Sequence, residues 1–174
     1  RIYIAEEGYM RITSFILPLK ENEESYVKSD ENDSYFLIEL DSITVDLDDY
    51  REESHGDDDD LPGLEGLTWM PNDGNFKVAN EKDPAMIVTI SLDGNLLYHE
   101  EIDYADDLSG LAYDSELDLL WVLSDQNEQV FLTNLNGTII YDYWDLSIVN
   151  PEGIAINNLV YPPEMYIVSD PSSP

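Results

Sequence analysis

A short phrase occurs three times in this chain, and its spacing constrains the fold more than any other feature. The phrase reads Leu-Glu-Gly-Leu-Thr-Trp at 64–69, Leu-Ser-Gly-Leu-Ala-Tyr at 108–113 and Pro-Glu-Gly-Ile-Ala-Ile at 151–156. Its glycines Gly66, Gly110 and Gly153 are 44 and 43 residues apart. A period of roughly 40–45 residues is typical of a β-propeller, in which each repeat is one four-stranded blade. We therefore predict an all-β fold of four-stranded antiparallel blades, with about three to four blades in the chain.

Two further marks recur with the phrase. An acidic residue ends the apolar run that follows each copy, and tight-turn pairs stand at 93–94 (Asp-Gly) and 136–137 (Asn-Gly), again 43 residues apart. Such pairs favour tight hairpins because both central residues need a positive φ. The pairs formed by the phrase and its acid are Glu65 with Glu81, Ser109 with Asp125, and Glu152 with Asp170, separated by 16, 16 and 18 residues. The glycine of each phrase is expected to allow close packing near the propeller axis, and no stretch carries the capped 3.6-residue pattern of a helix.

The ends of the chain are interpreted as parts of blades. Residues 1–7 resemble the middle strand of another blade, with Glu6 in the place of the recurring acid, and residues 9–17 form its next strand. We therefore expect residues 1–174 to form a single, partial propeller domain. Residues 18–62 form an acidic segment inserted between blades, with strands expected at 35–40 and 43–47. The stretch 48–60 lacks the spacing of an EF-hand loop, which favours a solvated loop over a calcium-binding one.

The net charge of the chain limits the classes of partner that it can bind. It has 39 acidic and 7 basic residues, a formal net charge of −32, and no cysteine. Nucleic acids and anionic membrane surfaces are disfavoured because both are bound through Lys and Arg. Divalent cations and basic proteins are the natural partners of such a chain. Adaptation of the surface for solubility or salt explains the charge equally well. No stretch is long and apolar enough to span a membrane.

Six stretches of the chain, taken together, resemble the SdiA-regulated family of bacterial β-propeller proteins. They are 63–69, 80–84, 107–113, 123–125, and 151–155 with 167–171. The resemblance covers residues 1–17 and 61–174 and implies the later blades of a propeller whose earlier blades are missing here. It also implies an exported location, in the periplasm, outside the cell or in an organelle lumen, after removal of a signal peptide. Related propellers bind calcium, but the resemblance implies no defined activity.

The recurring acids are the candidate site. Blade symmetry places equivalent residues at similar radius and height, so the acids are expected to form a partial ring at the mouth of the central channel. Two interpretations remain open: the ring holds a Ca²⁺ ion through oxygen ligands, or its members accept hydrogen bonds that lock neighbouring loops. Ser109 stands where the other copies have Glu, so a cation site would be richer on the other two sides. The candidate metal ligands are Glu6, Glu65, Glu81, Asp125, Glu152 and Asp170.

Three functions are compatible with these features. The first is a non-catalytic, calcium-binding propeller that acts as an interaction module or as a subunit of an exported or lumenal assembly. The second is a metal-dependent esterase, phosphatase-like or lactonase-like, that activates water at the carboxylate ring. The third is a structural protein with an acidic surface. Lys82, beside Glu81, either pairs with a carboxylate or contacts a substrate, and no phosphate-binding loop, nucleophile elbow or zinc motif is present.

Overall fold

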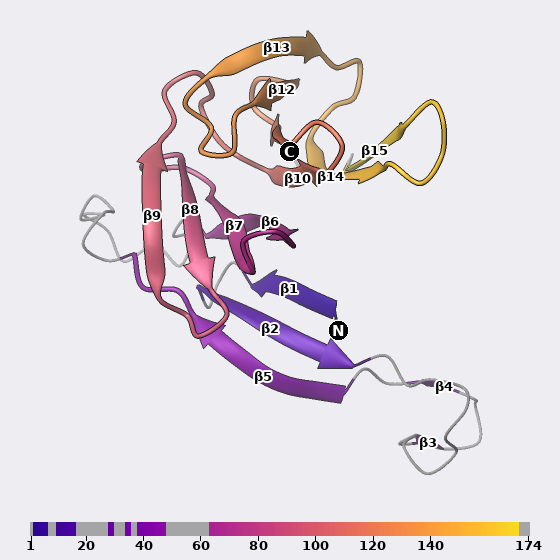
Figure 1. The fold of residues 1–174 in the computed structure, drawn as a ribbon. Coiled ribbons are helices and arrows are strands. Elements are labelled where there is room, and N and C mark those ends of the chain that lie inside the picture. Colours follow the sequence, from indigo (N-terminus) through magenta and orange to yellow (C-terminus); the bar gives the residue numbers. More distant parts are fainter. Residues whose placement is uncertain are drawn as a thin grey trace.

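The computed structural model describes residues 2–6, 10–16, 28–29, 34–35, 38–47 and 63–170, and within them it contains strands and turns but no helix. Four antiparallel sheets follow one another around an arc (Figure 1). The first contains β1 (Ile2–Glu6), β2 (Arg11–Ile16) and β5 (Ile38–Thr44). The second contains β6 (Leu64–Met70), β7 (Asn75–Asn80), β8 (Met86–Ser91) and β9 (Leu96–Glu101). The third contains β10 (Gly110–Asp114), β11 (Leu119–Ser124), β12 (Gln129–Thr133) and β13 (Ile140–Asp145), and the fourth contains β14 (Pro151–Asn157) and β15 (Glu164–Ser169).

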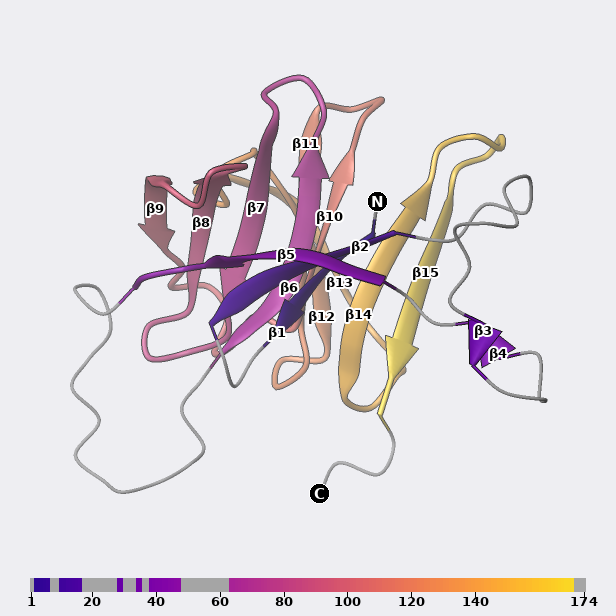
Figure 2. The ribbon, with the colours of Figure 1, turned by 90° about the horizontal axis from the view of Figure 1, so that it is seen from below.

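This arrangement confirms the predicted propeller architecture. The second and third sheets are complete blades in which the strands pair in sequence order. The first sheet has three strands, and the fourth has two. Figure 2 shows β9 at one side of the molecule and β15 at the other. A separate short ladder pairs β3 (Lys28–Ser29) with β4 (Ser34–Tyr35).

The segment before the second blade differs from the expected pair of strands. A single strand, β5, pairs with β2 across residues 38–44, with a register shift between Ser14 and Phe15. The chain then leaves the sheet, and Val45 and Leu47 are buried in the core between the first and second blades. The alternating apolar residues Val45 and Leu47 therefore belong to a loop that packs into this core, and they do not form a second strand. The acidic stretch 48–60 lies outside the described residues.

The blades stack through two apolar cores. In β8, Met86, Val88 and Ile90 face the core shared with the first blade, whereas Ile87 faces the core shared with the third blade. This strand is covered on both sides, so the period-2 alternation of its side chains distributes them between two cores rather than between core and solvent.

The glycines of the repeated phrase let the innermost strands approach closely. A Cβ built on Gly66 lies 2.8 Å from the backbone nitrogen of Leu111, and one built on Gly110 lies 3.4 Å from the Cα of Gly153. A methyl group at Gly66 cannot be accommodated without moving the neighbouring strand. These contacts confirm that the glycine serves packing between β6, β10 and β14.

A turn of the third blade is fastened to the second blade. Lys77, in β7, is only 5% exposed, and its ammonium group donates to Asn136 Oδ1 at 3.1 Å and to Thr89 Oγ1 at 2.7 Å. Burial lowers the pKa of Lys77, and the two hydrogen bonds satisfy the ammonium group in this setting. The turn at 134–139 is thus held against the second blade.

Candidate functional site

Glu81, Asp125 and Asp170 each follow the second strand of their sheet, and in the second and fourth sheets the same backbone corner holds the acid. The amide of Glu81 donates to the carbonyl of Gly63 at 3.0 Å, and the amide of Asp170 donates to that of Asn150 at 3.1 Å. Gly63 and Asn150 each lie three residues before the glycine of the phrase. The repeat therefore does mark one equivalent position in successive blades.

In the third blade a side chain, rather than a backbone carbonyl, accepts the hydrogen bond from the amide of the recurring acid. Asp107, also three residues before its glycine, is 1% exposed. One carboxylate oxygen accepts from Ser124 Oγ at 2.6 Å and from the amide of Gln126 at 3.1 Å, and the other accepts from the amide of Asp125 at 3.3 Å. Ser124 is itself fully buried. Asp107 therefore closes the loop that leaves β11, in the way a buried carboxylate must be satisfied.

Asp125 is placed beside two other carboxyl groups. Partial burial raises its pKa to about 7, helped by a hydrogen bond from its carboxyl group to Asp107 and by the negative charges of Asp107 and Glu152. Glu152 lies in β14, so the group joins the third and fourth sheets. Like charges at short range favour the protonated form of one member.

The second blade contributes an ion pair to the same region. Lys82 Nζ donates to Glu81 Oε1 at 2.5 Å, and this hydrogen bond raises the pKa of Lys82, with the charge of Asp107 adding to the effect. The carbonyl of Glu81 accepts from the amide of Leu108 at 2.8 Å, which ties the corner of the second blade to the loop before β10. Of the two roles expected for Lys82, pairing with a carboxylate is the one that this geometry shows.

We call the group formed by Glu81, Lys82, Asp107, Asp125 and Glu152 the carboxylate cluster. Three of the six predicted acids, Glu81, Asp125 and Glu152, belong to it.

The other predicted acids have different surroundings. Glu6 accepts from Arg11 Nη2 at 2.8 Å and from the hydroxyl of Thr13, and these bonds, that from Arg11 first, lower its pKa. Its side chain is thus engaged within its own sheet. Glu65 is half-buried in β6, and Asp170 is exposed after β15. The structure does not show these three acids and the carboxylate cluster forming one closed ring.

Ser109 explains the departure from Glu in the second copy of the phrase. It is 2% exposed, and its hydroxyl donates to the carbonyl of Pro151 in β14 at 2.6 Å. At this position the phrase holds one blade to the next. A short side chain fits this buried contact.

The fit to a metal ion is limited in this arrangement. Within residues 2–6, 10–16, 38–47 and 63–170, no group of three or more His, Cys, Asp or Glu side chains is arranged to hold a metal. The oxygens of Asp107 already accept from protein donors, and one oxygen of Glu81 accepts from Lys82. Calcium binding therefore stays a prediction, and it requires Asp125 and Glu152 to converge on a common point.

Asp107, Ser124 and Asn127 were missed as site residues. Asn127 Oδ1 accepts from the amide of Asp106 at 2.9 Å and lies 2.8 Å from Ser124 Oγ, which extends the network. A search for acids repeated at the blade period passes over Asp107, because its equivalents are Gly63 and Asn150. Its position just before the second copy of the phrase is the signal that could have found it.

The raised pKa of Asp125 predicts a specific pH dependence. An unfolded aspartate titrates near 4, so the folded protein binds this proton more tightly than the unfolded chain does. The resulting stabilisation is complete below about pH 4 and is lost as the pH rises through about 7. We expect Asp125→Asn to be more stable than the wild type at pH 8.5, with the difference shrinking towards pH 5. Thermal midpoints of both proteins from pH 5 to 8.5 measure this, and parallel curves would contradict it.

Comparison with known proteins places this geometry among β-propellers. A similar solved structure is a nidogen/laminin complex, with 16% identity and a TM-score of 0.53 over 90% of this chain and 49% of that one. A second is the periplasmic gluconolactonase PpgL of Pseudomonas aeruginosa, with 11% identity and a TM-score of 0.51 over 97% of this chain and 39% of that one. A third is an inactive virginiamycin B lyase of Staphylococcus aureus with quinupristin, with 15% identity and a TM-score of 0.50 over 98% of this chain and 52% of that one. These likenesses show the fold. The chain spans about half the length, or less, of each of these proteins. None of the curated proteins compared with it is significantly similar in sequence.

The described residues include no helix long and apolar enough to cross a membrane. The family described as SdiA-regulated matches residues 21–173, which include all three copies of the repeated phrase. The match also takes in most of the acidic segment 18–62, which the predicted resemblance left out, and it does not extend to residues 1–17. By this match over most of its length, the chain belongs to the SdiA-regulated family.

Proposed function

We propose that this protein is a non-catalytic, calcium-binding β-propeller that acts as an interaction module in an exported or lumenal setting. The observation that carries the proposal is the position of Asp125 between Asp107 and Glu152, carboxyl groups that come from two adjacent blades. A divalent cation shared by Asp125 and Glu152 relieves their repulsion and links the blades. Carbonyl oxygens and water complete the six to eight oxygen ligands that calcium takes.

The composition of the chain supports the interaction role. A formal charge of −32 attracts basic partners and accelerates their association. Calcium sites in extracellular modules have dissociation constants of about 10⁻⁴–10⁻³ M, which suits an exported location. One similar structure is a protein complex, but its partner belongs to that protein and is not transferred to this one.

Thermal melts with and without calcium test the proposal. With a Kd of about 0.5 mM, about 10 mM calcium stabilises the folded state by about 1.8 kcal/mol, which raises Tm by about 4–7 °C for a chain of this size. The double variant Asp125→Asn/Glu152→Gln is expected to lose this shift. A matched control, Glu116→Gln/Asp142→Asn, removes the same charge from exposed positions and is expected to retain it. Equal shifts in both variants, or none in the wild type, would mean that the acids are structural.

Metal-dependent hydrolysis of esters or lactones is the second candidate. The pKa of Asp125, about 7, lies in the range that suits a general base at neutral pH. Its test is turnover of a panel of lactones and simple esters with calcium present. Turnover that Asp125→Asn abolishes would replace the non-catalytic proposal, whereas its absence, together with a calcium-dependent Tm shift, would support the interaction module.

A further inference from the structure

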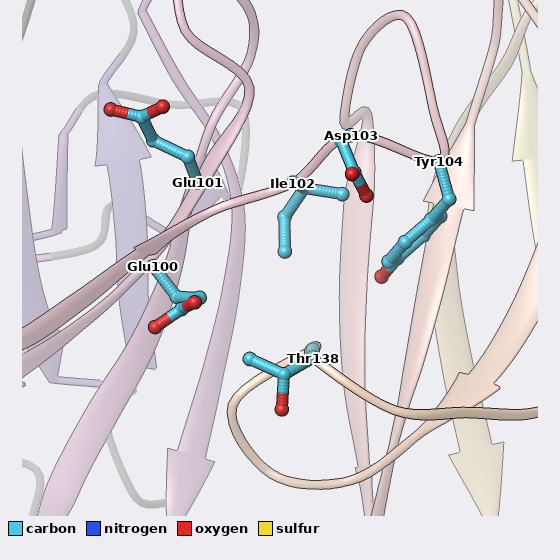
Figure 3. A pocket seen from close by; sticks show the side chains of 7 residues that line it. Glu100, Glu101, Ile102, Asp103, Tyr104 and Thr138 are labelled. Carbon is cyan, nitrogen blue, oxygen red and sulfur yellow. The ribbon is translucent and has the colours of Figure 1, made fainter.

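A pocket lies between the second and third blades, and it shares no residue with the carboxylate cluster. Its volume is about 410 Å³, within the range of sites that hold small ligands. It is bounded by the end of β9 with the chain that follows it and by the turn between β12 and β13, as Figure 3 shows. Its lining residues are Glu100, Glu101, Ile102, Asp103, Tyr104, Gly137 and Thr138.

The walls of the pocket are held in place by packing. The turn that carries Gly137 is fastened to the second blade by the hydrogen bond from Lys77 to Asn136. A Cβ built on Gly137 lies 2.6 Å from Ile87 Cδ1 and 2.9 Å from Ile102 Cδ1. The turn therefore rests directly on the apolar side chains of the second blade, and Ile102 gives the pocket an apolar floor.

The rim of the pocket is negatively charged. Glu100, Glu101 and Asp103 line it, and no Lys, Arg or His is among its lining residues. In Figure 3, Glu100 and Asp103 lie on either side of Ile102, and Glu101 is turned away from it. One oxygen of Glu100 accepts from the hydroxyl of Tyr98 at 2.5 Å, which holds this carboxylate in position.

Tyr104 adds an unsatisfied polar group. Its ring packs on Phe131 with the centroids 4.7 Å apart, and its hydroxyl is buried without a hydrogen-bond partner among the described residues. The hydroxyl oxygen lies 3.6 Å from the point where a Cβ of Gly137 would be. An unpaired buried hydroxyl is costly. The Tyr104 oxygen is shielded from the pocket in this structure, so a ligand N–H becomes its partner only when the turn at Gly137 shifts.

We propose that this pocket binds a guanidinium or ammonium group on a short aliphatic stem. The stem packs on Ile102, and the cationic head lies between Glu100 and Asp103. A shift of the turn at Gly137 lets one N–H reach the oxygen of Tyr104. Either a free amine or an arginine or lysine side chain of a partner protein has this chemistry. The net charge of −32 favours the approach of both.

The test is a titration followed by NMR at about 150 mM salt, where non-specific attraction between exposed charges is screened. The probes are agmatine, its uncharged analogue butylurea, and the peptide acetyl-Gly-Arg-Gly-amide. We expect saturable shifts of the amides at 102–104 and 137–138 with agmatine and none with butylurea. Peptide binding at least as tight as that of agmatine assigns the site to a partner's side chain, whereas agmatine binding without the peptide assigns it to a free amine.

Variants separate the pocket from the general charge of the protein. Glu100→Gln/Asp103→Asn is expected to weaken agmatine binding at least about tenfold, because each charge-assisted hydrogen bond is strong. Tyr104→Phe keeps the ring and is expected to weaken binding about three- to tenfold. The control Glu116→Gln/Asp142→Asn is expected to change binding less than about twofold. Equal losses in the control, or no saturable shift with about 10 mM of either cationic probe, would overturn the proposal whatever the outcome of the calcium experiment.

Discussion

Replacing Gly66 with alanine is expected to destabilise the protein by about 3 kcal/mol. The added methyl group would lie 2.8 Å from the backbone nitrogen of Leu111 and 3.0 Å from the carbonyl carbon of Gly110. Both obstacles belong to the backbone of the neighbouring blade, so no side-chain rotation relieves them. The two innermost strands must separate, which also loosens the cores on either side. Urea unfolding monitored by tryptophan fluorescence measures the loss.

The equivalent glycine of the fourth sheet provides the control. A Cβ on Gly153 meets only Val168 Cγ2, at 3.0 Å, and Val168 is 65% exposed. This side chain has room to rotate, so Gly153→Ala is expected to cost less than about 1 kcal/mol. The two substitutions are chemically identical and occupy the same place in the repeat. Equal losses of stability would show that the close approach of β6 and β10 is not what requires Gly66.

The second large effect is expected at Asp107. Asp107→Ala removes the acceptor of the Asp125 and Gln126 amides and of the Ser124 hydroxyl. Each buried donor left without a partner costs about 1–3 kcal/mol. Ser124 retains its contact with Asn127 and Gln126 is exposed, so we expect a total loss of about 2 kcal/mol. For a chain of this size that lowers Tm by about 4–8 °C. Differential scanning calorimetry measures the change.

Two further measurements give this prediction its specificity. Asp106 is exposed, so Asp106→Ala is expected to change stability by no more than about 0.5 kcal/mol. Removal of Asp107 also removes a hydrogen bond and a negative charge that raise the pKa of Asp125. That pKa, followed by NMR, is therefore expected to fall below about 7 in Asp107→Asn as well as in Asp107→Ala. An unchanged pKa would show that burial alone raises it.

The repeated phrase could be interpreted correctly because it reports local geometry. A glycine in each innermost strand, and an acid after each second strand, occur at the blade period because every blade makes the same turns. The amides of Glu81 and Asp170 accordingly meet the same backbone corner. Periodicity cannot tell what the side chain at such a corner touches, because the partner residues do not recur at the blade period. Glu81 meets Lys82, Asp125 meets Asp107, and Glu6 meets Arg11.

Features that break the period were the ones missed. Asp107 and Ser109 each occupy a repeat position with a residue that the other copies lack. Asp107 makes a buried hydrogen bond within the third blade, and Ser109 makes one from the third blade to the fourth sheet. The pocket lined by residues 100–104 and 137–138 was also not predicted. Its two segments belong to different blades and are more than thirty residues apart in the chain. The strand β5 runs from the first predicted strand into the second and ends at Thr44, because the apolar residues Val45 and Leu47 serve the core after the strand has ended.

The sequence by itself determined the fold class, the order of the blades and the positions of the innermost strands, because blade-length periodicity and tight-turn residues act through the backbone. Only the tertiary structure decided which acids meet. Glu81, Asp125 and Glu152 join a cluster completed by Asp107 and Lys82, whereas Glu6 is held by Arg11 in its own sheet. The reason is physical: a carboxylate is stabilised by whichever donors and charges lie within a few ångströms, and here those partners, Lys82, Asp107 and Arg11, do not recur at the blade period.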